Sequence, residues 1–191
     1  MFLLLAGFFI ASYGQIACKQ KERDGEKSAG FFPVLSYLKS QVAHIDTALY
    51  FIMKITITDS LSDTTYIKRE EFRGLANDFL NIPDLTEKKY KKMYAESKFY
   101  DESVNRVVIT YAAKEDDLEL RKEEVHIITD PAGGDKVSTI ILDKFISTRD
   151  SNVQKRLLWQ VNERFQVVTS IEKLNQPDFT QTLKVIWNQP Y

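Results

Sequence analysis

Apolar and polar residues follow two different rhythms along the chain, and these predict helices near its beginning and strands through most of the rest. The first apolar stripe has helical spacing between about 33 and 46, with Pro33 in a first-turn position. It consists of Leu35, Leu38, Val42 and Ile45. The sequence therefore predicts an amphipathic helix as the first element of the fold.

Strict alternation begins at Leu49 and continues to Thr58, which is typical of a half-buried strand. The residues predicted to share its buried face are Leu49, Phe51, Met53, Ile55 and Ile57. The polar stretch 59–63 predicts a turn, and 64–68 predicts a strand that returns beside the first.

Helical spacing then returns twice. Apolar residues between 72 and 80 predict a helix over 69–81, which Pro83 ends. Thr86 can cap a further helix that reaches about Lys98. The exposed side of this helix is predicted to carry Lys88, Lys89, Lys91 and Lys92.

Beyond Ser103 the pattern predicts strands joined by short turns. In the strand predicted over 118–129, the apolar residues change from even to odd positions, from Leu118 and Leu120 to Val125 and Ile127. This change of side indicates a bulge near Glu123 and Glu124. The stretch 130–135 is the strongest hairpin turn of the chain. Residues 137–147 are apolar on both faces, and we expect a central strand that is covered on both sides.

Three terminal strands alternate cleanly and complete the pattern. Their apolar positions are Val153, Leu157, Trp159 and Val161, then Phe165, Val167 and Ile171, then Leu183, Val185 and Trp187. The turns between them are too short for parallel crossovers, so an antiparallel meander is predicted. The predicted fold class is α+β, with an antiparallel β-meander sheet packed against N-terminal and inserted helices in one domain over 31–191.

The composition is typical of one globular domain, and it argues against nucleic-acid binding and against a disulfide-stabilised fold. Hydrophobic residues make up 43% of the 191 residues and charged residues 28%, close to globular averages. Lys plus Arg at 26 nearly cancels Asp plus Glu at 27, so no overall field attracts nucleic acid. The single cysteine excludes an intrachain disulfide framework.

The chain begins with an apolar run that predicts export. Residues 1–12 have the length of a signal-peptide core and fall short of the roughly 20 residues that a membrane span needs. Ala17-Cys18 follows, and the chain then turns strongly polar. We therefore expect a signal peptide over 1–17 and a flexible tether over 18–30.

This arrangement resembles the precursors of bacterial lipoproteins, and the polar stretch after the cysteine resembles that of small envelope lipoproteins from Bacteroidota-type bacteria. In that family a small residue precedes a cysteine that receives a diacylglyceryl group before the signal is cut off. The resemblance implies that Cys18 is the lipid-attachment residue and that the domain lies at the periplasmic face of the outer membrane or at the cell surface. The sequence departs from the family pattern at Gln15 and Ile16.

Two other interpretations of the cysteine remain open. Ser12 and Gly14 suit ordinary signal-peptidase cleavage after Gly14, which would leave Cys18 as a free thiol. A buried structural cysteine is the second alternative, although the charged residues that follow it argue against burial.

Recognisable catalytic and metal-binding motifs are missing from the sequence. Its two histidines are His44, predicted at a helix end, and His126, predicted on the strand face opposite Val125 and Ile127 in a structural or surface role. The acidic stretch 115–117 lacks EF-hand spacing, and no nucleophile motif occurs. No metal and no cofactor is predicted.

Two groups of residues are candidates for binding. Trp159, Phe165 and Trp187 share the apolar faces of the terminal strands; core packing is the default, and an apolar-ligand surface, similar to that of periplasmic lipoprotein carriers, is the sharper alternative. The lysines over 88–92 form either a solvated helix face or a contact for lipid headgroups or an acidic partner.

Three functions follow from these observations. The leading one is a membrane-anchored extracytoplasmic lipoprotein that acts as a binding or envelope-assembly module. The alternatives are a carrier of lipid or another apolar ligand, and an enzyme whose site the sequence does not reveal. The predicted partners are the membrane, through the lipid anchor, and a protein or apolar ligand, with nucleic acid excluded.

Overall fold

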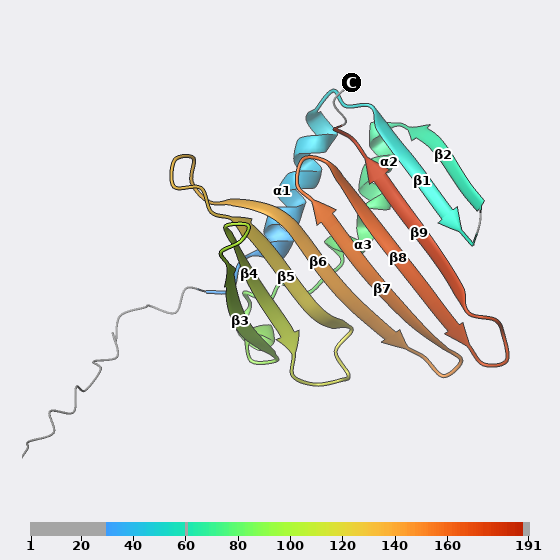
Figure 1. Ribbon diagram of the computed structural model, residues 1–191. Helices are drawn as coiled ribbons and strands as arrows, with labels where there is room; N and C mark the ends of the chain where they lie inside the picture. The colour runs from blue at the N-terminus through green and yellow to red at the C-terminus, as the bar shows by residue number, and fades with distance from the viewer. Residues whose placement is uncertain (1–29, 60, 189–191) are drawn as a thin grey trace, which may run out of the picture.

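The computed structural model describes residues 30–59 and 61–188, and its central element is a nine-stranded antiparallel sheet (Figure 1). The strand order is β2-β1-β9-β8-β7-β6-β5-β4-β3. The strands are β1 (Ile52–Thr58), β2 (Leu61–Ile67), β3 (Tyr94–Asp101), β4 (Arg106–Ala113), β5 (Leu120–Ile128), β6 (Lys136–Ser147), β7 (Ser151–Gln160), β8 (Arg164–Lys173) and β9 (Phe179–Ile186). The predicted signal peptide and Cys18 lie outside the described residues.

The topology is a meander from β3 to β9, to which the first hairpin is added at the far side. Each strand from β3 to β8 pairs with the next one in the chain. The β1–β2 hairpin then pairs with β9, with Met53 opposite Ile186 and Thr58 opposite Gln181. The α+β class and the antiparallel meander are confirmed, whereas the pairing of the first strand with the last was not visible in the local pattern.

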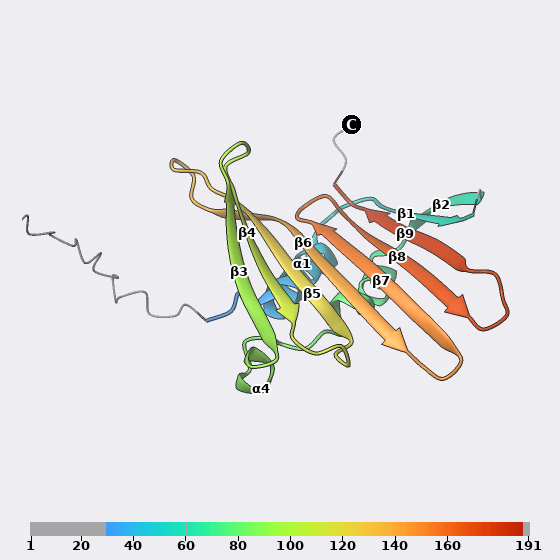
Figure 2. The same cartoon turned by 60° about the horizontal axis from the view of Figure 1, so that its bottom comes forward.

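Three helices lie on one face of the sheet, which we call the covered face. They are α1 (Val34–Thr47), α2 (Arg69–Leu75) and α3 (Asn77–Leu80). Figure 2 shows the sheet curving around them. The buried stripe of α1 is Val34, Leu38, Val42 and Ile45, so the predicted helix is confirmed with Val34 in place of Leu35.

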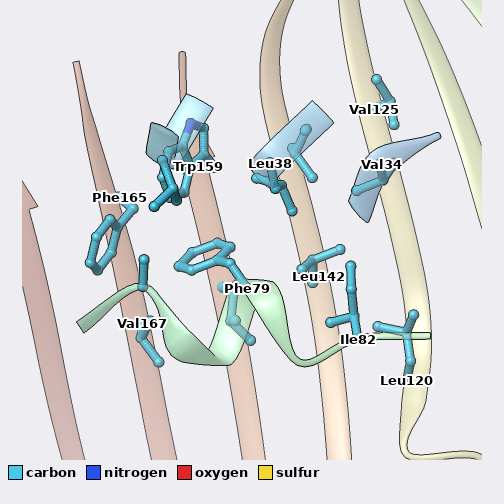
Figure 3. Close-up of a cluster of buried hydrophobic side chains, with 14 of the residues drawn as sticks. Val34, Leu38, Phe79, Ile82, Leu120, Val125, Leu142, Trp159, Phe165 and Val167 are labelled. Atoms are coloured by element: carbon cyan, nitrogen blue, oxygen red, sulfur yellow. The ribbon is translucent and has the colours of Figure 1, made fainter. Parts of the chain in front are cut away.

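The core lies between these helices and the covered face (Figure 3). Along the strands, every second side chain points toward this core. In β6, for example, Ile140 and Leu142 are buried and Ile141 is not. Of the described residues, those that form the core all fall between Phe31 and Trp187. A chain from Lys19 to Tyr191 therefore contains this entire core.

The two inserted helices differ from their predictions. The helix expected over 69–81 is divided at Ala76, whose ψ of 3° is not helical, into α2 and α3. The prediction of a helix through Lys98 is wrong. Within this stretch only Lys88–Lys91 form a helix, α4, and β3 begins at Tyr94. Pairing with β4 and burial of the Tyr94 ring, whose hydroxyl donates to the Leu120 carbonyl at 2.8 Å, override the local helical preference.

The predicted buried face of the first strand is also wrong. Leu49 and Phe51 precede β1 and are exposed, and the buried residue of this strand is Ile52. Met53 and Ile55 point away from the helices, because the residues opposite Val185 and Leu183 of the covered face are Lys54 and Thr56. Alternation fixes which residues share a face, but it does not fix which face meets the helices.

The central strands differ from their predictions in two details. The predicted bulge lies slightly earlier than expected, between Leu120 and Lys122, and a second irregularity follows between His126 and Ile127. β6 is central as predicted, but helices cover only one of its faces. On the other face Phe145 is half-buried beneath the Arg121 guanidinium, which lies 5.2 Å from the centre of its ring.

Candidate functional site

The face of the sheet opposite the helices is the first candidate, and no helix of the described part of the chain covers it (Figures 1 and 2). We call it the open face. It carries a row of interacting polar side chains, most of them charged, that crosses from β7 to β4, which we call the charge ladder. Its members are Arg156, Asp143, Lys122, Glu124, His126 and Arg106.

The first half of the charge ladder follows directly from strand register. Arg156 stands opposite Asp143, and Asp143 stands opposite Lys122 on the next strand. The Arg156 Nε lies 3.9 Å from Asp143 Oδ1, and the Lys122 Nζ lies 3.3 Å from Asp143 Oδ2. Opposite charges on neighbouring strands stabilise the sheet modestly.

The second half of the charge ladder includes His126. Lys122 Nζ lies 3.2 Å from Glu124 Oε2, and His126 Nε2 lies 2.5 Å from Glu124 Oε1. Arg106 Nη1 lies 3.5 Å from the other ring nitrogen, Nδ1. Since an arginine can only donate, this arrangement fits an imidazole that accepts at Nδ1 and donates from Nε2. His126 lies on the face opposite Val125, as predicted, and its ring nitrogens contact Glu124 and Arg106 there.

The charged side chains of the open face leave it with an excess of positive charge. Burial raises the pKa of Glu124, but hydrogen bonds from His126 and Lys122 outweigh it, so the pKa lies below its ordinary value. Both ladder carboxylates, Glu124 and Asp143, lie within 4 Å of a cationic side chain. Arg164 and Lys184 add positive charge to the same face, since they stand opposite Ile186 and Ile55, which point away from the helices. Asp101, opposite Arg106, and Glu172, on the same side of β8 as Arg164, add negative charge to it.

The outer edge of β2 is the second candidate. The strand pairs with β1 on one side only, and it ends the sheet. Six of its seven residues are exposed, among them Leu61 at 78% and Tyr66 at 73%. Asp63 is the one charged residue in the strand. An exposed edge strand with a single charge offers its free backbone groups to another strand.

The opposite edge, β3, has a different character. It carries Glu96, Lys98 and Asp101, and the Lys98 Nζ lies 3.6 Å from Glu96 Oε1. Charged residues, lysine above all, are a common protection of an edge against pairing. The two edges of the sheet are therefore not equivalent.

A buried carboxyl group lies on the covered face. Glu123 stands between Tyr111 of β4 and Leu142 of β6, and it is 1% exposed. Its Oε1 has no hydrogen-bond partner. Burial, aided by the nearby Asp84 carboxylate, raises the pKa of Glu123 to about 8. Because the group is buried, its protonation state affects the stability of the folded chain.

The structure brings together the three aromatic residues singled out in the sequence. Trp159 and Phe165 stack with ring centres 5.5 Å apart, and Trp187 lies 5.3 Å from Trp159. Phe72 of α2 and Phe79 of α3 cover them, at 5.2 Å from Trp187 and from Trp159 respectively. Figure 3 shows Phe79 against this cluster. The rings fill the core as the default interpretation has it, and they present no open apolar surface.

The lysine cluster lies around α4 and not on a long helix. Lys89 pairs with Glu87 at 3.1 Å, and Lys91 lies 5.5 Å from the centre of the Phe31 ring. His44 is exposed in the last turn of α1, as predicted. Cys18 lies outside the described residues, and its lipidation stays a prediction.

Sequence reasoning missed the two candidate surfaces. The alternation of Arg156 with Leu157, and of Lys122 with Glu123, shows which residues share a face once strand register is known. The edge of β2 has a weaker signal, a seven-residue β-prone stretch with one charge and no proline. Neither signal identifies an open face or edge without the topology.

Among the described residues, no cluster of three or more potential ligands could hold a metal ion, and no helix is long and apolar enough to span a membrane. Comparison of the chain with protein-family models, with curated proteins and with solved structures found no match.

Proposed function

We propose that this protein is a lipid-anchored binding module of the bacterial envelope, which is tethered through Cys18 and binds an acidic protein partner on its open face. The observation that carries the binding role is the one-sided covering of the sheet. Helices close one face, and the other presents the charge ladder together with Arg164 and Lys184. A sheet face that carries an excess of positive charge, and that no described helix covers, suits a negatively charged partner.

The anchoring role rests on the apolar start of the chain, Ala17-Cys18 and the polar stretch behind it. Acyl chains contribute about 0.8 kcal/mol per buried methylene, so two or three chains hold a protein at a membrane without help from the folded domain. Helices α1 to α3 then close the covered face, and the open face remains available for binding.

Metabolic labelling with a radioactive fatty acid tests the anchor. We expect the full chain to incorporate the label and to fractionate with membranes, and the Cys18→Ala chain to do neither. Mass analysis of the mature N-terminus provides the independent readout. An unmodified chain that begins at Gln15 would show ordinary signal-peptidase cleavage and would overturn the anchor.

Site-specific photo-crosslinking in cells tests the binding role. A crosslinking residue at Gln166, at the centre of the open face opposite Leu158 and Lys184, is expected to yield a protein adduct. The same residue at Lys39, which is exposed on α1, is the matched control and should yield none. Arg156→Glu should weaken the Gln166 adduct, and raised salt should do the same, since the attraction is electrostatic. Equal adducts from both positions would argue against a specific open-face partner.

A further inference from the structure

The edge of β2 is complementary to itself, and we infer that it pairs with β2 of a second copy of this chain. The pairing is antiparallel and continues the two sheets into one. The inference does not depend on the lipid anchor or on the open-face partner, because it concerns a different surface and a different occupant.

The register of the hairpin determines which backbone groups of β2 are free. Thr58 pairs with Leu61 across a connection of two residues. In such a hairpin the flanking pair is hydrogen-bonded, and hydrogen-bonded pairs alternate with non-bonded ones along the strands. Leu61, Asp63 and Thr65 therefore direct their N–H and C=O groups toward β1. Ser62, Thr64 and Tyr66 direct theirs outward, away from the sheet.

The outward N–H and C=O groups of β2 can pair with the same groups of a second β2 when the two strands run antiparallel and are centred on Thr64. With Thr64 opposite Thr64 of the other copy, Ser62 stands opposite Tyr66, and each opposed pair can exchange two hydrogen bonds. The two-fold axis passes between the two threonines, as a closed symmetric dimer requires. Both copies then keep their helices on the same side of the joined sheet.

The side chains are compatible in this register. On the covered side Leu61 meets Ile67 of the other copy, which joins two apolar residues, and Asp63 meets Thr65. The strand has one charge, and the register keeps that carboxylate from facing its own copy. At each end of the paired strands, the same register places Lys68 of one copy near the turn at Asp59 of the other. The ammonium and carboxylate groups of these two residues have opposite charges.

The surroundings of β2 leave room for a second copy. Both views show β2 at the rim of the sheet, with the helices away from its outer side (Figures 1 and 2). The contacting surface is that of one short strand, which places the interface at the small end of known sizes. We therefore expect a weak dimer, with a dissociation constant on the order of micromolar.

Sedimentation velocity of the Lys19–Tyr191 chain tests the pairing over a concentration range that brackets this value. The wild-type chain should pass from monomer to dimer. Thr64→Lys places two like charges at the two-fold axis and should keep the chain monomeric, and Thr64→Glu should do the same. An equimolar mixture of the two variants should recover a dimer. Ser97→Lys, on the β3 edge, is the matched control and should dimerise like the wild type.

Disulfide formation gives a second measurement. The Lys19–Tyr191 chain contains no cysteine, because the single one is Cys18. Opposed residues of a hydrogen-bonded pair lie about 5.5 Å apart between Cα atoms, within the range of a disulfide. Thr64→Cys should therefore crosslink two copies under mild oxidation. Thr65→Cys, whose opposed residue is Asp63, should not.

Three outcomes would overturn the pairing. One is a wild-type chain that stays monomeric over the whole range, which would leave the edge of β2 for an extended segment of a different protein. Another is a wild-type dimer that Thr64→Lys does not weaken. The third is a mixture of the two charged variants that stays monomeric although the wild type dimerises. Circular dichroism of each variant confirms that it is folded.

Discussion

Glu123 and Glu124 are consecutive residues of β5, and their carboxyl groups lie on opposite faces of the sheet. Glu123 is buried on the covered face between Tyr111 and Leu142, and Glu124 joins the charge ladder on the open face through His126 and Lys122. Burial raises the pKa of the first, and hydrogen bonds lower the pKa of the second. Folding stability should therefore respond to the two groups in opposite directions.

The raised pKa of Glu123 predicts that part of the stability is lost as pH rises. Its pKa is about 8 in the folded chain, against an ordinary value of 4.5 for a glutamate in water. Between these values the unfolded chain releases a proton that the folded chain keeps, so the free energy of unfolding falls with pH. The slope is at most about 1.4 kcal/mol per pH unit. The contribution is complete below the unfolded pKa and is lost as pH passes through the folded one.

Urea unfolding at pH 5 and at pH 8 measures this effect. Glu123→Gln keeps the shape of the side chain and cannot ionise, so its stability should fall less between the two pH values than that of the wild type. The variant should be the more stable of the two at pH 8. Equal changes in both proteins would show that Glu123 titrates as if it were exposed.

The lowered pKa of Glu124 predicts the opposite dependence. A carboxylate with a depressed folded pKa stabilises the folded chain above its unfolded pKa, and the contribution is lost as pH falls through the folded pKa. Glu124→Gln should therefore cost about 1 kcal/mol at pH 7 and less in acid. Thermal unfolding over an acid titration measures the difference. Glu102→Gln, in an exposed turn, is the matched control and should have little effect at either pH.

Much of the fold could be predicted because apolar and polar residues alternate within most of its strands, which is visible without knowing how the strands pair. The three terminal strands alternate cleanly, and their apolar sides, with Leu157, Phe165 and Val185 among them, are the sides that are buried. Short turns then leave the meander as the natural arrangement. The tight turn at 130–135 is confirmed as well, since Gly134 has a φ of +78° and its N–H donates to the Asp130 carbonyl at 2.8 Å.

The predictions were wrong where the conformation or the buried face of a segment depends on a strand with which it pairs elsewhere in the chain. Residues 94–98 contain a pattern compatible with a helix, and only the partner strand β4 makes them a strand. The β1 strand lies next to β9 at the far end of the chain, so the sequence around Met53 carries no information on which side the helices lie. The free edge of β2 follows from the same long-range pairing, which is why it was missed.

The aromatic cluster predicts a large cost for the loss of one ring. Phe79 is fully buried, and its ring centre lies 5.2 Å from that of Trp159 and 5.3 Å from that of Phe165. Phe79→Ala should lower the free energy of unfolding by about 3 to 5 kcal/mol. Phe99→Ala is the matched control, because this side chain is 65% exposed on the β3 edge, and it should cost less than about 0.5 kcal/mol. Similar costs for both changes in urea unfolding would contradict the packed core.

The contact between Asp78 and Lys155 predicts a measurable coupling between α3 and the sheet. The Lys155 Nζ lies 2.8 Å from each carboxylate oxygen of Asp78, and both side chains are partly buried. Since α3 spans only Asn77–Leu80, one such contact is a substantial part of its attachment to β7. We expect a coupling energy of about 1 kcal/mol, at the upper end for pairs that water still reaches.

A double-mutant cycle with Asp78→Asn and Lys155→Met measures this coupling by urea unfolding. The exposed pair of Glu87 and Lys89, whose side chains are 52% and 62% exposed, is the matched control. Its coupling should be close to zero, because long exposed side chains lose as much entropy as the pair gains in attraction. Added salt should reduce the Asp78–Lys155 coupling only in part, since burial limits screening. A coupling as small as that of the control pair would mean that α3 is held by Phe79 and its apolar neighbours alone.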